Sequence, residues 1–315
     1  MTGKTAVVAI GGNSLITDSE HRSVEDQYRA AGETDHHIAG LVAGGWDVVI
    51  THGNGPQIGF ILRRSELSRH ELHEVPLDVC GADTQGAIGY ALQQNLINDF
   101  ARMGVDKGVV TVVTQVEVDP ADPAFANPSK PIGSFLTQEE AEQRRDEDGW
   151  QVAEDADRGW RRVVASPAPL RIVELAAIRS LLASGFVVIG VGGGGLPVVA
   201  DADGNLRGVP AVIDKDLASA LLAAQLDADL LLISTAIEHV ALDFGTPAER
   251  AVANLTLAEA KQYLAEGRHF KAGSMAPKME AVIQFLETGG KEAIITNPEN
   301  IERALAGETG TRITR

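Results

Sequence analysis

Near its amino terminus the chain reads Thr5-Ala6-Val7-Val8-Ala9-Ile10-Gly11-Gly12-Asn13-Ser14. The first six residues carry no charge and are apolar or β-branched, which is typical of a strand buried on both faces of a parallel sheet. The two glycines that follow let the backbone turn sharply and approach a ligand closely. This stretch therefore predicts a central strand that ends in a tight turn, at the edge where open α/β sheets bind ligands.

Similar short apolar runs recur along the chain. They cover residues 46–51, 108–116, 186–191, 230–235 and 292–296. Segments with helical spacing, such as 170–183 and 217–226, lie between most of them. This alternation predicts an α/β fold with an open, mainly parallel sheet and helices on both faces. Two helix starts are marked, because Thr256 with Glu259 fits a capping box and Ser274 precedes an early proline.

One long stretch, residues 119–169, interrupts this alternation. It is rich in proline and acidic residues and contains two of the three tryptophans. A loop of this length without secondary structure is uncommon inside a compact domain. We therefore predict a small subdomain, inserted into one large domain that spans residues 1–315, although a long surface loop would also fit the composition.

The second apolar run leads into Thr51-His52-Gly53-Asn54-Gly55-Pro56, a glycine turn similar to the first. In both places a strand is expected to end in glycines, with a helix directly after them. Unpaired N–H groups at a helix start attract anions, and an asparagine side chain adds a donor without adding charge. Either turn alone would pass for an ordinary βα loop. Two such turns at the carboxyl ends of strands predict an anion-binding site.

A third glycine cluster, residues 190–195, matches the GxGxxG spacing of dinucleotide-binding folds. That motif requires a helix to open on it, whereas the residues that follow predict a strand over 196–199 and a tight hairpin turn over 201–205. We therefore interpret these glycines as a place where the backbone approaches nucleotide phosphates. The sequence contains no GxxxxGK[ST] loop, which excludes a P-loop kinase.

The composition excludes several other classes of protein. A formal net charge of -17 argues against binding to nucleic acid or to an anionic membrane. No apolar run approaches the roughly 20 residues that span a membrane. Cys80 is the one cysteine, so it cannot form an internal disulfide, and no Cys/His spacing resembles a zinc site. We therefore predict a cytoplasmic protein that has no metal site of its own, with Cys80 buried as a small apolar side chain.

Three lysines lie beside glycine turns or helix starts, namely Lys130, Lys215 and Lys278. Phosphoryl transfer depends mainly on in-line positioning and on positive charge near the transferring oxygens, which a lysine supplies. A surface ion pair with Asp214 or Asp216 would explain Lys215 as well. Lys278 lies in the first turn of an expected helix, where a cation is unfavourable unless an anion is near. The three lysines therefore predict a phosphoryl-transfer site.

Taken together, these segments resemble the amino acid kinase superfamily and, within it, the carbamate kinase family. The resemblance is carried by blocks that follow the family's order, at residues 9–15, 51–57, 130–133, 159–167, 192–198, 213–219, 273–278 and 310–311. It implies an open three-layer α/β/α sandwich with a protruding subdomain and a homodimer. It also implies Mg²⁺-dependent phosphoryl transfer between ATP with carbamate and ADP with carbamoyl phosphate.

The resemblance also implies roles for individual residues. Lys215 and Lys278 would hold the transferring phosphoryl group, and Asp216 would orient Lys215. Lys130 would reach the carbamoyl end from the subdomain. The carbamoyl phosphate site would be formed by Gly11, Gly12, Asn13, Gly53 and Asn54. The nucleotide site would be formed by Gly193, Gly194, Thr235, Met275 and Lys278.

Some positions depart from the family's usual sequence. Thr235-Ala236-Ile237-Glu238 stands where Thr-Asp-Val-Asp is usual, residues 81–85 replace a usual Met-Ser pair, and Ala276 replaces a common glycine. These departures concern nucleotide affinity and metal handling, and they leave the charged groups near the transferring phosphate in place.

Two alternative functions stay open at this point. One is a kinase of the same superfamily that acts on glutamate or N-acetylglutamate. Those relatives carry a lysine two residues before the first glycine pair, where this chain has Ala9, which favours carbamate. The other is a nucleotide-binding regulator without catalysis, which the missing carboxylate at Ala236 would favour.

Overall fold

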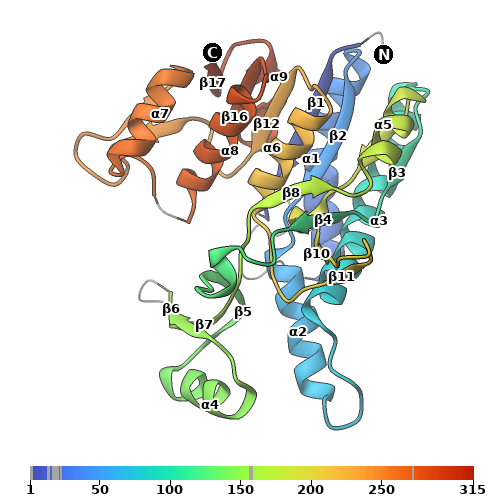
Figure 1. Ribbon diagram of the computed structural model, residues 1–315. Helices are drawn as coiled ribbons and strands as arrows, with labels where there is room; N and C mark the ends of the chain where they lie inside the picture. Colours follow the sequence, from blue (N-terminus) through green and yellow to red (C-terminus); the bar gives the residue numbers. More distant parts are fainter. Residues whose placement is uncertain (1–2, 13–14, 16–20, 22, 156–158, 272) are drawn as a thin grey trace.

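The computed structural model describes residues 3–12, 15, 21, 23–155, 159–271 and 273–315. Its centre is a sheet with the strand order β15-β17-β16-β12-β1-β2-β9-β3 (Figure 1). In that order the strands are β15 (Asn254–Thr256), β17 (Thr311–Thr314), β16 (Glu292–Thr296), β12 (Leu230–Ser234), β1 (Thr5–Ile10), β2 (Asp47–His52), β9 (Val187–Ile189) and β3 (Val109–Thr111). All neighbouring strands are parallel except β16 and β17, so the predicted mainly parallel sheet is confirmed.

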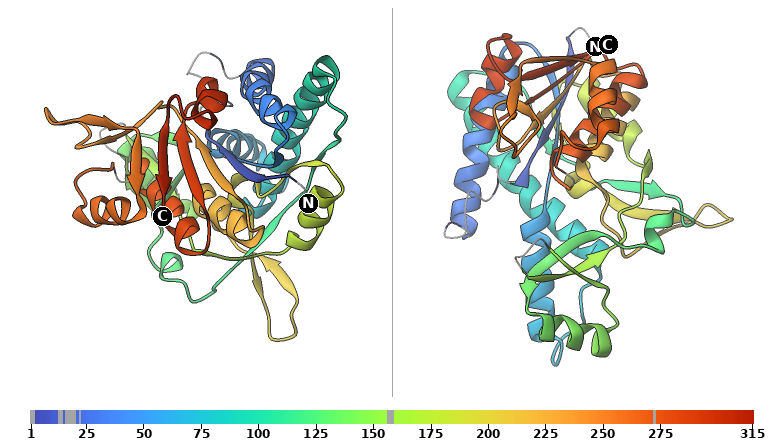
Figure 2. Two further views of the ribbon diagram at one scale, coloured as in Figure 1. Left: turned by 90° about the horizontal axis from the view of Figure 1, so that it is seen from above. Right: turned by 90° about the vertical axis from the view of Figure 1, so that its left-hand side faces the viewer.

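Helices cover both faces of this sheet, as Figure 2 shows. Because side chains alternate along a strand, Ala6, Val8 and Ile10 of β1 pack on one face, and Val7 and Ala9 pack on the other. The first face is covered by α1 (Val24–Ala43), α3 (Leu77–Met103) and α9 (Ile301–Leu305), and the second by α5 (Leu175–Ala183), α6 (Lys215–Gln225) and α8 (Met275–Glu287). The result is the expected three-layer α/β/α sandwich, which explains why β1 is buried over its whole length.

A second, four-stranded sheet has the order β11-β10-β4-β8. Its strands are β11 (Leu206–Gly208), β10 (Leu196–Ala200), β4 (Gln115–Val118) and β8 (Pro169–Ile172). β10 and β11 form an antiparallel hairpin, as predicted from the sequence after the third glycine cluster. That cluster forms only a short 3-10 turn, η3 (Gly192–Gly194), which agrees with its interpretation as something other than a dinucleotide-binding motif.

Two predicted elements are wrong in their extent. The strand expected over 108–116 is divided, because β3 ends in the central sheet and β4 begins in the second sheet. Between the two strands the hydroxyl of Thr114 takes the place of a backbone partner. It donates a hydrogen bond to Val112 O at 2.7 Å and accepts one from the N–H of Val191 at 3.0 Å. The helix expected over 170–183 starts only at Leu175, because the preceding residues pair with β4 as strand β8.

Residues 119–169 are called the insert below. Within it β5 (Lys130–Leu136), β7 (Trp160–Val164) and β6 (Val152–Glu154) form an antiparallel sheet next to α4 (Gln138–Asp148), after a short turn η2 (Pro123–Phe125). The insert protrudes from the body of the protein (Figure 1). Its Ile132 and Val164 pack against Ile58 and Leu62 of α2 (Gly55–Ser68) and against the buried Cys80 of α3.

The helix starts agree with the sequence only in part. Thr256 and Glu259 form the predicted capping box of α7 (Leu257–Glu266), which follows the hairpin of β13 (Val240–Leu242) and β14 (Arg250–Val252). Ser274 holds the cap position of α8, but its side chain makes no capping hydrogen bond in the described part of the chain. The first α-helix that the structure describes after the first glycine turn is α1, which begins at Val24 with a capping box at Ser23. A last short turn, η4 (Pro298–Asn300), precedes α9.

Within the described ranges, no helix has the length and apolar character needed to cross a membrane.

Candidate active site

The strands β1, β2 and β12 end side by side at one edge of the central sheet. The N–H of Gly11 donates to Ser234 O at 3.0 Å, and the N–H of Gly53 donates to Ile10 O at 3.0 Å. Both amides thus extend the sheet, so they would have to leave these bonds to bind phosphate as the resemblance implies. A Cβ atom on Gly11 would lie only 3.1 Å from Ser234 O, so this glycine is needed for the close approach of the strand ends.

The first turn and the second turn meet at a lysine of α6. A Cβ atom on Gly53 would lie 3.4 Å from the N atom of Gly12 and 3.4 Å from Cδ of Lys215. Gly12, Gly53 and Lys215 therefore lie next to one another at the carboxyl edge of the sheet. Asn13, which was predicted to take part in this site, lies outside the described residues.

A cluster of two lysines and one aspartate forms the charged centre of the site. Lys215 Nζ donates to one carboxylate oxygen of Asp216 at 2.5 Å, and Lys278 Nζ donates to the other at 3.0 Å. Only 14% of the Lys215 side chain, 15% of the Lys278 side chain and 4% of the Asp216 side chain is exposed. A solvated surface ion pair is therefore the wrong interpretation of Lys215. Helices α6 and α8, far apart in the chain, each contribute one lysine.

The protonation of Asp216 follows from this arrangement. Burial alone would raise the pKa of its carboxyl group, but the charges and hydrogen bonds of Lys215 and Lys278 outweigh burial and lower the pKa to about 2. The carboxylate is ionised at neutral pH, so two ammonium groups share a single negative charge. The cluster keeps a net positive charge in an otherwise acidic protein.

The third glycine turn packs against the second one. Val191 has a positive φ of 52°, which is strained for a β-branched residue. A Cβ atom on Gly192 would overlap Nε2 of His52, and one on Gly193 would overlap the side-chain amide of Asn54. Gly193, predicted on the nucleotide side, thus lies directly against a residue predicted on the substrate side. Gly194, also predicted on the nucleotide side, packs against the carbonyl of Ile213, just before α6.

Sequence reasoning missed His52 and Thr84. The Nδ2 group of Asn54 donates to Thr84 Oγ1 at 2.8 Å, which fixes the orientation of the asparagine side chain. Burial lowers the pKa of His52 to about 4, and the positive charge of Lys215 contributes to this shift. The hydrogen bond to Gly53 O acts in the opposite direction but is weaker than the effect of burial. His52 is therefore neutral near pH 7 and orients the turn without adding charge. Its position directly before the glycines was the one available sequence signal.

Lys130 reaches the same helix from the insert. Its Nζ donates to Asp214 Oδ2 at 2.7 Å, and Asp214 is the residue that caps α6 just before Lys215. The structure therefore brings Lys130, Lys215, Asp216 and Lys278 to one end of α6. Asp214 was considered only as a partner of Lys215, and it was missed as a partner of Lys130.

Thr235 and Met275 lie at the borders of this cluster. The N–H of Thr235, just after β12, donates to Thr296 O at 2.8 Å. Met275 is the first residue of α8, and its N–H and that of Ala276 both donate to Lys271 O at 3.2 Å. Their backbone N–H groups are thus engaged within the protein, so a nucleotide contact of Met275 would come from its side chain or its carbonyl oxygen.

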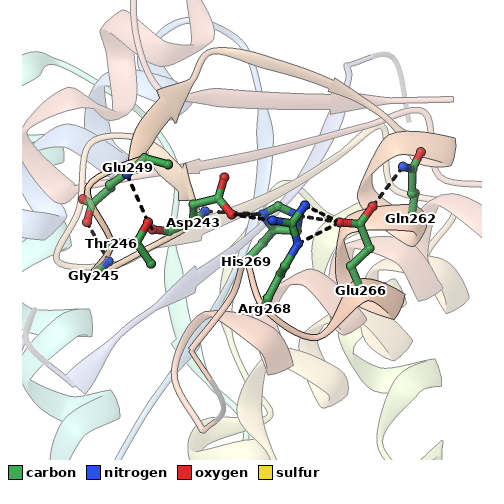
Figure 3. A network of polar contacts seen from close by, with 9 residues as sticks. Asp243, Gly245, Thr246, Glu249, Gln262, Glu266, Arg268 and His269 are labelled. Carbon is green, nitrogen blue, oxygen red and sulfur yellow. Dashed lines mark hydrogen bonds and ion pairs between the residues drawn. The ribbon is translucent and has the colours of Figure 1, made fainter.

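The loop before α8 is anchored by a buried histidine (Figure 3). His269 is 3% exposed, its Nε2 lies 2.8 Å from Glu266 Oε2 at the end of α7, and its Nδ1 accepts from the N–H of Asp243 at 3.3 Å. Arg268 also donates to Glu266, at 3.0 Å. Hydrogen bonds from Gln262, His269 and Arg268 lower the pKa of Glu266 to about 2. This network joins α7 to the turn after β13.

The described residues contain no group of three or more His, Cys, Asp or Glu side chains that could hold a metal ion. The buried carboxylate of the site, Asp216, has both oxygens bonded to lysines. The donor set therefore does not suit a resident metal.

Comparisons with known proteins agree with this geometry. The model of the amino acid kinase family matches residues 4–297. A carbamate kinase-like protein, YahI of Escherichia coli, is 52% identical over 98% of both chains, and the carbamate kinase of Pyrococcus horikoshii is 47% identical over 98% of both. The solved structure of carbamate kinase from Giardia lamblia bound to AMP-PNP superimposes with a TM-score of 0.93, at 41% identity and over 99% of both chains.

An α/β sandwich with a cationic cluster at the carboxyl edge of its sheet is the architecture of a phosphotransferase. The chain belongs to the amino acid kinase family, and within it to the group formed by the carbamate kinases and the carbamate kinase-like proteins.

Proposed function

We propose that this protein is a carbamate kinase, which transfers a phosphoryl group reversibly between carbamoyl phosphate with ADP and carbamate with ATP. The observation that carries the proposal is the sharing of Asp216 between Lys215 and Lys278, beside the first two glycine turns. Full-length similarity to carbamate kinases supports the choice of acceptor.

The chemistry follows from charge and position. Phosphoryl transfer spreads negative charge over the equatorial oxygens of the transferring group, and it needs little covalent help from the protein. Lys215 and Lys278 supply fixed ammonium groups for that charge, and Asp216 holds both in place before the substrate arrives. Mg²⁺ enters with the nucleotide as MgADP or MgATP and neutralises part of its phosphate charge. Gly53, whose Cβ atom would lie beside Lys215, has no side chain to keep a short acceptor such as carbamate away from that lysine.

The direct test is ATP formation from ADP, Mg²⁺ and carbamoyl phosphate, measured in a coupled assay. A parallel reaction with ATP and N-acetylglutamate serves as the comparison. We expect turnover with carbamoyl phosphate. Turnover with N-acetylglutamate alone would reject carbamate as the acceptor. ADP binding without ATP formation would favour a nucleotide-binding regulator, which is the alternative suggested by the exposed Ala236.

Lys130 is expected to act on carbamoyl phosphate more than on the nucleotide. We predict that Lys130→Ala raises the KM for carbamoyl phosphate about tenfold to a hundredfold, which is the usual effect of losing one hydrogen bond to a charged group. The KM for ADP should change much less. Steady-state kinetics with each substrate varied in turn measures both values, and an unchanged KM for carbamoyl phosphate would contradict the role assigned to the insert.

We further propose that the protein works in the cytoplasm as a homodimer. The exposed stripe of α3 that includes Gly86, Ala87, Tyr90, Gln94 and Ile97 carries no charge, which suits contact with a second copy. Sedimentation equilibrium should give twice the chain mass for the native protein. Tyr90→Glu, which places a charge in this stripe, should give a monomer.

A further inference from the structure

Asp214 contacts both the catalytic helix and the insert. It stands at the cap position of α6, directly before Lys215 and Asp216, and its side chain is 18% exposed. Its two carboxylate oxygens have different partners. Oδ1 accepts from the N–H of Asp216 at 2.9 Å, whereas Oδ2 accepts from Lys130 Nζ at 2.7 Å. One side chain thus connects the start of α6 to a strand of the insert.

The capping bond alone does not require an aspartate. Asparagine and serine cap helices about as well, because one oxygen acceptor is sufficient for the free N–H groups. A second carboxylate near a phosphate site is unfavourable for anionic substrates unless a cation neutralises it. The start of α6 also favours a negative charge at this position, and Lys130 is the cation that neutralises Asp214 on the side of the insert.

The backbone next to Asp214 is also attached to the insert. The N–H of Val212 donates to Ala165 O at 2.9 Å, directly after β7. Ala165 and Ala211 form an isolated parallel bridge. The segment that leads into the cap is therefore bonded to the segment that leaves the insert, and the Lys130–Asp214 pair lies at the end of this connection.

The far end of the insert has a separate attachment to the body. Asp148, at the end of α4, pairs with Arg69 beyond the end of α2 at 3.0 Å and with Arg144 at 2.6 Å. Arg144 also lies 3.6 Å from Glu66 of α2. These ion pairs and the apolar contacts described above hold the insert at α2. The pair with Asp214 and the backbone hydrogen bond between Val212 and Ala165 hold it at the start of α6. The two attachments can be broken independently.

We propose that Asp214 is a positioning residue, which fixes Lys130, and with it this part of the insert, at the start of α6 beside the phosphoryl-transfer site. It acts through Lys130 and α6 and does not touch the reacting atoms. This inference rests on the proposed function, because it assigns to Lys130 the carbamoyl end of the substrate.

The kinetic test is a double-mutant cycle of Asp214→Asn and Lys130→Ala. Asparagine keeps the cap and removes the charge. We expect Asp214→Asn to raise the KM for carbamoyl phosphate about tenfold with kcat changed less than about threefold, as befits lost positioning of a binding group. The KM of the double variant for carbamoyl phosphate should be no higher than that of Lys130→Ala alone. This result would correspond to a coupling of about tenfold between the two residues. Asp214→Glu keeps the charge, so its KM for carbamoyl phosphate should be closer to the wild-type value than that of Asp214→Asn.

A second measurement does not depend on activity. Hydrogen exchange of β5 and β7 in the protein without substrate should be faster in Asp214→Asn than in the wild type, because the insert loses its ion pair with the start of α6 and keeps only the backbone hydrogen bond between Val212 and Ala165 there. Glu287→Gln is the matched control, since it removes one charge from a surface pair with Lys261 between α7 and α8. This control should change neither the exchange nor the KM.

Additive effects in the cycle, or unchanged exchange in the insert, would show that Asp214 only caps α6 and would overturn the proposal. A wild-type protein that forms no ATP from carbamoyl phosphate would overturn the proposed function instead. In that case the exchange experiment would still decide whether Asp214 holds the insert.

Discussion

Lys215→Ala and Lys278→Ala are each expected to lower kcat for ATP formation at least about a hundredfold, because each variant removes one fixed positive charge that stabilises the transferring phosphoryl group. Both ammonium groups are largely buried and bonded to the same carboxylate, so solvent cannot replace either one well. The measurement is the initial rate with saturating ADP and carbamoyl phosphate.

The double variant gives additional information. Residues that act as one unit show non-additive losses, so removing both lysines should cost little more than removing the more important one. Lys261→Ala is the control, because Lys261 forms an exposed pair with Glu287 and is 54% exposed. A kcat within about threefold of the wild type for Lys215→Ala or Lys278→Ala would contradict the assigned roles.

Asp216→Asn is expected to lower both activity and stability. The substitution leaves two ammonium groups close together without the carboxylate that orients them, so we expect a loss in kcat of at least about a hundredfold. The lowered pKa of about 2, against an ordinary value of 3.8, corresponds to about 2 kcal/mol of folding stability near neutral pH. The Asp216→Asn variant should lose most of this folding stability, because an uncharged amide cannot form the two ion pairs.

The pH dependence has a defined sign. The pKa of Asp216 is lower in the folded protein than in the unfolded chain, so its contribution is fully present above about pH 4 and is lost as the pH falls toward 2. The difference in urea midpoint between wild type and Asp216→Asn should therefore be large at about pH 6 and small near pH 2. A difference that is independent of pH would contradict the ion-pair origin of the stability.

Local sequence was sufficient to predict the strands β1, β2, β12 and β16 of the central sheet, whereas β15 and β17 were not predicted. The runs at 5–10 and 292–296 match β1 and β16 in both bounds, and those at 46–51 and 230–235 match β2 and β12 within one residue. These strands are covered by helices on both faces, so their whole length is apolar and their ends are clear. The run at 108–116 failed because periodicity does not show that a chain changes from one sheet to another after Thr111.

The residues of the candidate site could be predicted from the sequence, but the contacts between them could not. The glycine turns marked the carboxyl edge of the sheet, and the three lysines beside glycine turns and helix starts were recognised. The sequence could not show that the amides of Gly11 and Gly53 are used by the sheet itself, since this depends on which strands are neighbours. It also gave no reason to connect His52 with the third glycine turn.

By itself the sequence determined the α/β sandwich, the turns at its carboxyl edge and the three lysines that we propose for phosphoryl transfer. These features depend on residues that are close in the chain, where burial and backbone geometry leave a direct pattern. Only the tertiary structure decided that Lys278 shares Asp216 with Lys215 and that Lys130 pairs with Asp214, across 62 and 84 positions of sequence. Such ion pairs form only when two elements that are distant in the chain pack together, and the local sequence around each lysine does not show which elements will pack.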